Sequence, residues 1–91
     1  MKKSIKNKLA KRMVTLKAIA NPVRLAILYE LAGGQKGPQE LANRLGENYF
    51  NVAKQLAVLK AAGLIQSKRK GLRAFYRLAK PSVLKVVEQL P

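Results

Sequence analysis

Only three residues, Gly46, Glu47 and Asn48, separate two segments that both have the sequence character of helices. The first segment fits a short helix over residues 38–45. The second begins after Asn48, a good N-cap residue, and stops at Gly63. Two helices joined by so short a glycine-containing turn are typical of a helix-turn-helix. A plain helical hairpin is the alternative interpretation, because its sequence would look similar.

The segment after Gly63 changes to the period-two alternation that is typical of β-strands. Arg73, Phe75 and Arg77 alternate there with four other residues. Gly71 lies where a tight turn would reverse the chain. The alternating set is Leu72, Ala74, Tyr76 and Leu78. The sequence therefore predicts a β-hairpin over residues 64–79 with a basic tip.

Single proline and glycine residues divide the rest of the chain. A helical pattern runs over residues 4–20, and an Asn21-Pro22 start and a Gly33-Gly34 end enclose the next helix. Pro81 closes the last strand before a short amphipathic helix. We therefore expect one domain over 1–91, mainly α with a β-hairpin (α+β). It would be a winged helix-turn-helix with a basic helix over 1–20, a core over 21–79 and a C-terminal helix over 81–90.

The charge balance indicates a polyanionic partner, because 19 Lys and Arg residues face only four acids and give a formal net charge of +15. The chain contains no Cys, His or Asp. The usual zinc sites, disulfides and nucleophile–base pairs therefore cannot be assembled. We expect no enzymatic activity, no metal and no cofactor.

Basic residues near the start are not followed by an apolar run long enough for a signal peptide or a membrane span, since Lys8, Lys11, Arg12 and Lys17 interrupt it. We therefore expect a cytoplasmic protein. An amphipathic membrane-surface binder would account for the basic N-terminal segment alone. That alternative leaves the hairpin and the capped helices unexplained, so we expect no membrane partner.

Four motifs in order resemble the ArsR/SmtB (arsenic-repressor-like) winged-helix transcription regulators. They are 16-LKAIANPVRLAIL-28, 40-ELANRLG-46, 56-LAVLKAAGLI-65 and 70-KGLRAFYRLA-79. The resemblance implies a homodimer built on the first and last helices, which binds a twofold-symmetric operator in double-stranded DNA and usually represses until an effector releases it. The dimer surface would comprise Ile5, Leu9, Met13, Leu16, Val83, Leu84, Val87 and Leu90.

The chain departs from the metal-sensing members of that family. Some of them place cysteines near the start of the first helix of the motif, where this chain has Gly37, Gln39 and Ala42. Others use His and Asp on the last helix, where Glu88 is the single acid. We therefore expect regulation that does not respond to metal.

The recognition helix differs from its relatives as well. Phe50 and Asn51 stand in place of small polar residues, and Ala53 and Gln55 stand in place of a Ser and a His. We include Ala53 in the predicted DNA surface because of this position, but the base preference of relatives does not transfer.

The helix after Asn48 is expected to insert its N-terminal half, beginning with Asn48 itself, into a major groove. Asn51 and Gln55 carry the amide that pairs with adenine, Lys54 could reach guanine or a phosphate, and Phe50 could contact a thymine methyl group. At about 100° per residue, Phe50 points away from the apolar stripe of the helix. We favour an exposed Phe50 whose partner is DNA. The alternative is that it packs against the wing or a neighbouring helix.

Four cations cluster at the hairpin tip with no acid among them: Lys68, Arg69, Lys70 and Arg73. A winged helix would lay them along the phosphate backbone or into a minor groove. A charged tip is also ordinary for a soluble protein, but unpaired cations repel one another without a polyanion nearby. Gln39 joins the predicted site, because phosphate contacts are common near a helix N-terminus.

Three further features are interpreted as mainly structural or left open. Arg24 would support a helix cap or pair with Glu30, and Tyr49 lies closer to the buried side of its helix. The basic segment 2–12 could grip flanking phosphates or form a solvated arm, and the two interpretations are compatible. The sequence thus predicts a sequence-specific homodimeric repressor of a palindromic operator. The alternative is an architectural protein that coats nucleic acid without specificity, and competitor DNA would distinguish the two.

Overall fold

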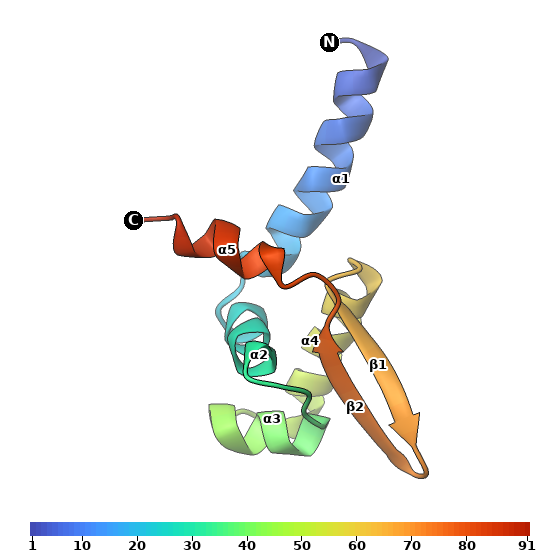
Figure 1. Cartoon of the computed structure of the whole chain (residues 1–91), viewed down its shortest axis with the longest axis vertical. Helices are drawn as coiled ribbons and strands as arrows, with labels where there is room; N and C mark the ends of the chain where they lie inside the picture. The colour runs from blue at the N-terminus through green and yellow to red at the C-terminus, as the bar shows by residue number, and fades with distance from the viewer.

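The computed structural model describes all residues 1–91 and contains five helices and one antiparallel two-stranded sheet (Figure 1). The helices are α1 (Lys3–Ile19), α2 (Pro22–Ala32), α3 (Pro38–Leu45), α4 (Tyr49–Ala61) and α5 (Ser82–Glu88). The strands are β1 (Ile65–Lys70) and β2 (Arg73–Leu78). The predicted order of helices, helix-turn-helix, hairpin and final helix is therefore confirmed.

Short-range capping explains where the helices of the motif begin and end. Gly46 ends α3 in the left-handed conformation with φ of 64°, a region that favours glycine. The Asn48 side chain then accepts hydrogen bonds from the backbone N–H groups of Phe50 and Asn51, at 2.8 and 3.3 Å. The left-handed backbone of Gly46 and the side-chain cap of Asn48 together set the turn between α3 and α4.

The hydrophobic core lies among α2, α3 and α4 and extends to the base of the hairpin. Its largest fully buried side chains come from these three helices and are Ile27, Leu28, Leu41, Val52, Leu56 and Leu59. Leu84 of α5 is only 8% exposed and belongs to the same cluster. Placing Leu84 on the dimer surface was therefore wrong, because this residue anchors α5 to the body of its own chain.

A hydrogen bond also ties α5 to α2. The Tyr29 hydroxyl donates to Glu88 Oε1 at 2.6 Å, and this bond to the carboxylate raises the pKa of Tyr29. With Leu84 it fixes the position of the last helix relative to α2.

The hairpin follows a regular register from Ile65 opposite Leu78 to Lys70 opposite Arg73, with Gly71 in the turn at φ of 62°. One further residue extends the sheet. Lys36 exchanges two backbone hydrogen bonds with Tyr76, of 3.1 and 2.9 Å, just before α3 begins. This bridge couples the start of α3 to the wing. No strand was predicted at this position, because a single bridging residue carries no strand pattern.

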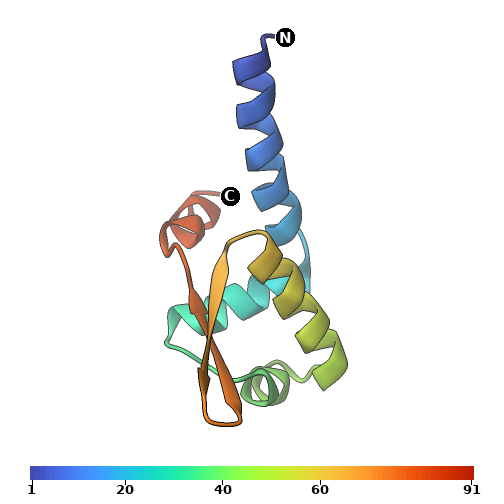
Figure 2. The same cartoon turned by 90° about the vertical axis from the view of Figure 1, so that its right-hand side faces the viewer.

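Helix α1 projects away from the rest of the molecule in both views (Figures 1 and 2). Ala18, near its C-terminal end, is its only buried residue. The large apolar side chains along the rest of the helix are about half exposed: Ile5, Leu9, Met13, Val14 and Leu16. A single chain therefore leaves this helix largely uncovered. None of the helices combines the length and the apolar character that a membrane crossing requires.

Candidate nucleic-acid interface

The exposed side of α4 carries an uncovered aromatic ring. Phe50 is 78% exposed, and its ring lies edge to face against that of Tyr49, with centroids 5.6 Å apart. Lys54 is exposed on the next turn and Ala53 is half-buried beside it. The structure thus presents Phe50 at the surface as expected, and it does not pack against the wing. Burying such a ring against another surface would be favourable.

Gln55 differs from its prediction because its side chain lies inside the protein. It is only 8% exposed and shares the buried side of α4 with Val52 and Leu56. Its Oε1 accepts a 2.7 Å hydrogen bond from Arg24 Nη1, and its Nε2 donates to Asn51 Oδ1 at 3.1 Å. Both ends of the amide are therefore used within the chain, and Gln55 is not presented to a base in this conformation.

Arg24 is structural as predicted and caps the end of a helix, whereas the alternative pairing with Glu30 was wrong. Its guanidinium donates to the carbonyl oxygens of Ala18 and Lys17, at 2.6 and 3.0 Å, as well as to Gln55. The two carbonyls lie at the C-terminal end of α1, where backbone acceptors lack partners within the helix. Arg24 therefore joins the end of α1 to the recognition helix.

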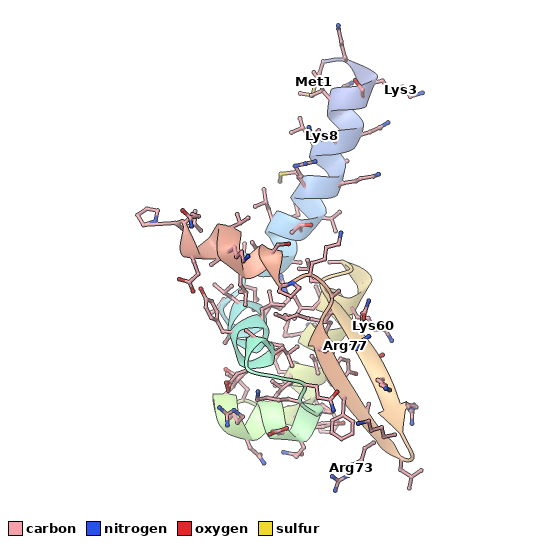
Figure 3. The ribbon with its side chains drawn as sticks, viewed as in Figure 1. Met1, Lys3, Lys8, Lys60, Arg73 and Arg77 are labelled. Carbon is pink, nitrogen blue, oxygen red and sulfur yellow. The ribbon has the colours of Figure 1, made fainter.

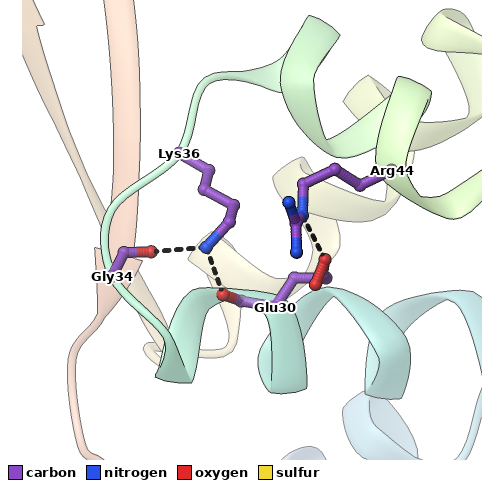
Figure 4. Close-up of polar contacts among 4 residues, drawn as sticks. All are labelled: Glu30, Gly34, Lys36 and Arg44. Carbon is purple, nitrogen blue, oxygen red and sulfur yellow. Dashed lines mark hydrogen bonds and ion pairs between the residues drawn. The ribbon is translucent and has the colours of Figure 1, made fainter.

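Glu30, the acid that we expected beside Arg24, instead pairs with Arg44 of α3 (Figure 4). Arg44 Nε donates to Glu30 Oε1 at 2.5 Å, and this bond lowers the pKa of Glu30 and raises that of Arg44. Lys36 Nζ donates to the backbone carbonyl of Glu30 at 2.7 Å. These bonds hold α3 and the loop before it against α2, and thereby position the first helix of the motif.

The four predicted cations of the wing, Lys68, Arg69, Lys70 and Arg73, are all exposed and form no salt bridge. Figure 3 shows Arg73 at the far end of the hairpin. Lys70 Nζ lies 5.7 Å from the centre of the Phe75 ring, a favourable cation–π distance. Leu72, at the turn, is 99% exposed. The hairpin tip is therefore a positively charged projection without internal counter-ions.

A hollow of about 510 Å³ separates the wing from the start of α3. It brings together Gln39, Arg69 and Arg73, which come from distant parts of the sequence. Tyr49 lines it as well and is 39% exposed, so it is less buried than the sequence suggested. Gln39 Nε2 is engaged by Asn43 Oδ1 at 2.9 Å. Asn48 belongs to the neighbouring turn, where its side-chain oxygen caps α4.

The basic residues of α1 lie at the other end of the monomer. Figure 3 places Lys3 and Lys8 at the end opposite Arg73. No acid precedes Glu30 in the chain, and none of the α1 cations forms a salt bridge. Within one chain, this segment does not extend the surface formed by α4 and the wing.

Two helices joined by a three-residue turn, followed by a basic hairpin, define a winged helix-turn-helix DNA-binding domain. Residues 21–67 match the sequence family described as bacterial regulatory protein, arsR family. The chain belongs to this family, whose members are DNA-binding transcriptional regulators and not enzymes.

Curated relatives carry regulatory names. The biofilm growth-associated repressor of Agrobacterium fabrum is 34% identical over 85% of this chain and 66% of its own length. The transcriptional activator HlyU of Vibrio cholerae is 35% identical over 89% of this chain and 75% of its own length. The regulator Rv0324 of Mycobacterium tuberculosis is 37% identical, but the match spans only 31% of that protein. The chain thus spans less than two thirds of several relatives that it matches.

Solved structures agree with this assignment. NolR from Sinorhizobium fredii has a TM-score of 0.87 at 26% identity and covers 97% of this chain and 88% of its own. Mb0332 from Mycobacterium bovis, described as a homodimeric winged helix-turn-helix DNA-binding domain, has a TM-score of 0.84 at 30% identity and covers 97% and 87%. HlyU from Vibrio cholerae has a TM-score of 0.81 at 33% identity and covers 97% and 91%.

Proposed function

We propose that this chain is a cytoplasmic, homodimeric repressor that binds a palindromic operator in double-stranded DNA and does not respond to metal. The observation that carries the DNA-binding part is Phe50, an aromatic side chain that is 78% exposed on the recognition helix. We expect this exposed ring to contact a thymine methyl group where α4 enters a major groove.

Charge supports the same surface. Lys54 on α4 and the four cations of the wing are exposed and form no salt bridge, so they can contact phosphates without first breaking an ion pair. Asn51 is half-buried at the start of α4 and supplies a polar side chain for a base edge. In this arrangement α4 would recognise sequence, and the wing would hold the flanking backbone.

The homodimer is supported by the uncovered helix α1 and by a relative. The exposed apolar residues Ile5, Leu9, Met13 and Leu16 lie within one narrow sector of α1 at about 100° per residue. Val83 and Val87 of α5 are half-buried and Leu90 is exposed. Figure 1 shows α5 beside the C-terminal part of α1. A second copy packed there would enlarge a core that is small in a chain of 91 residues. Mb0332, with the same fold, is described as homodimeric.

The residue inventory supports regulation without metal. The chain has neither Cys nor His, and no group of three or more potential metal-binding side chains comes together in the structure. Dissociation of the dimer or competition by another protein would then relieve repression.

Selection of genomic fragments by the purified protein tests this function, using excess competitor DNA at several salt concentrations. A repressor of a defined operator should recover a short set of inverted repeats that persists as salt rises. Indiscriminate recovery that collapses steeply with salt would contradict the proposal, because phosphate contacts alone behave in that way. The architectural alternative would then replace it. A reporter driven by a recovered promoter should rise when the protein is deleted, and a fall would indicate an activator.

A further inference from the structure

Four side chains form one chain of hydrogen bonds that runs from the protein interior to the start of α4. Arg24 Nη1 donates to Gln55 Oε1 at 2.7 Å, and Gln55 Nε2 donates to Asn51 Oδ1 at 3.1 Å. Asn51 Nδ2 lies 3.5 Å from Glu47 Oε2, a long final contact. We call these four residues the Arg24 hydrogen-bond chain. It links a buried position to Asn51, a half-buried polar side chain at the start of α4.

The direction of these bonds follows from the chemistry of the two ends. A guanidinium has only donors, and an ionised carboxylate has only acceptors. Gln55 is only 8% exposed, so leaving either end of its amide without a partner would be costly. Its oxygen must therefore face Arg24, since the reverse orientation would set two donors against each other. The amide nitrogen of Gln55 is then left to donate, and Asn51 has to accept with its oxygen.

This orientation restricts what Asn51 can offer to DNA. Its oxygen is turned toward Gln55, and its nitrogen is turned toward Glu47 in the turn before α4. Bidentate pairing of asparagine with adenine needs both atoms, because the amide oxygen accepts from N6 and the amide nitrogen donates to N7. Within the Arg24 hydrogen-bond chain, the Asn51 oxygen accepts the 3.1 Å bond from buried Gln55, whereas the Asn51 nitrogen makes only a long 3.5 Å contact with Glu47 and keeps a second N–H for a base.

We propose that Asn51 acts as a dedicated hydrogen-bond donor and prefers base edges that present acceptors, namely O6 and N7 of guanine or O4 of thymine. Gln55 is a positioning residue in this scheme, because it sets the orientation of Asn51 without touching DNA. The inference rests on the proposed function, since it assumes that α4 enters the major groove of an operator. It replaces the adenine pairing that the sequence suggested for Asn51.

Gln55→Glu is the decisive variant because it keeps the shape of the side chain and reverses its role. The new carboxylate still accepts from Arg24, but it can no longer donate to Asn51. Asn51 should then turn its nitrogen inward to donate to the carboxylate and present its oxygen to the groove. An acceptor in that position prefers the amino groups of adenine or cytosine.

The experiment is a binding selection from DNA randomised across the operator, carried out with the wild-type protein, Asn51→Ala and Gln55→Glu. At one base pair in each half-site, Asn51→Ala should lose a preference of about tenfold for guanine or thymine. Gln55→Glu should reverse that preference toward adenine or cytosine at the same base pair. Gln55→Met removes both bonds and should leave the base pair without preference. Circular dichroism melting verifies that each variant is folded.

Three results would overturn the inference. They are a wild-type preference for adenine at the base pair that is sensitive to Asn51, no effect of Asn51→Ala at any base pair, and an unchanged preference in folded Gln55→Glu and Gln55→Met. Failure of the proposed function looks different, because the wild-type protein would then select no site at all. That result would remove the inference together with its premise.

Discussion

The guanidinium of Arg24 donates a 2.7 Å hydrogen bond to the side-chain oxygen of Gln55, across 31 positions of the chain. The same guanidinium holds two carbonyl oxygens at the C-terminal end of α1. One side chain at the start of α2 therefore connects α1 with the recognition helix. Arg24 is therefore the first residue to test.

Arg24→Met should lower the free energy of unfolding by about 1–3 kcal/mol, because it leaves the buried oxygen of Gln55 without a donor. Urea unfolding at fixed protein concentration measures the effect. Arg69→Met is the matched control, since Arg69 is exposed on the wing and makes no salt bridge. It should change stability by no more than about 0.5 kcal/mol. Equal stability of the two variants would show that the Arg24 contacts contribute nothing.

Phe50→Ala should weaken operator binding and leave the stability of the protein nearly unchanged. The ring is 78% exposed, so its removal should change the free energy of unfolding by no more than about 0.5 kcal/mol. Operator affinity, measured by fluorescence anisotropy, should fall because the thymine contact is lost. A loss of stability of about 3–5 kcal/mol, as for a buried Phe, would mean that the ring is covered in solution.

Lys70→Ala should weaken binding to all DNA sequences alike and lower the slope of log affinity against log salt by about 1, because a phosphate contact is lost. Asn51→Ala should instead act mostly at the operator, by about 1–3 kcal/mol. Titrations with operator and random duplexes at several salt concentrations distinguish the two. Lys85→Ala on α5 is the charge-matched control and should have little effect. Equal losses on both duplexes for Asn51→Ala would show that α4 does not recognise bases.

Leu9→Glu should convert a dimer into a monomer, because it places a charge within the apolar stripe of α1. Lys8→Glu introduces the same residue one position earlier, outside the stripe, and should leave the dimer intact. Sedimentation velocity at micromolar concentration compares the two variants with the wild-type protein. The wild-type dimer should tighten as salt rises, since α1 is basic and no acid precedes Glu30. A wild-type monomer under these conditions would contradict the dimer proposal.

Glu30→Gln should reduce stability only above the acidic range. Arg44 lowers the pKa of Glu30 below its ordinary value of 4.5, so the ionised carboxylate stabilises the folded state. That contribution is complete above pH 4.5 and is lost as the pH falls through the lower folded pKa. Thermal melts between pH 3 and pH 7 should show two curves that converge at the acidic end. Glu40→Gln, which removes an acid without a salt bridge, should show no such convergence. A pH-independent difference for Glu30→Gln would exclude the linkage.

The elements of the fold were predictable because their signals are local. Gly46 and Asn48 set the turn of the motif through their own backbone and side-chain preferences, and Gly71 does the same for the hairpin. Counting around α4 also placed Phe50 on the exposed side, since helical geometry relates residues only a few positions apart. The positive charge of the chain needs no structure at all.

Only the tertiary structure decided which polar and apolar side chains find partners inside the protein. Gln55 lies on the border of the buried side of α4, and its burial depends on Arg24 reaching it from another helix. Leu84 lies in the core because the chain after β2 places α5 beside α2. Lys36 pairs with the sheet because the loop before α3 passes alongside Tyr76. These contacts join residues far apart in sequence, and no local pattern specifies the distance between two packed helices.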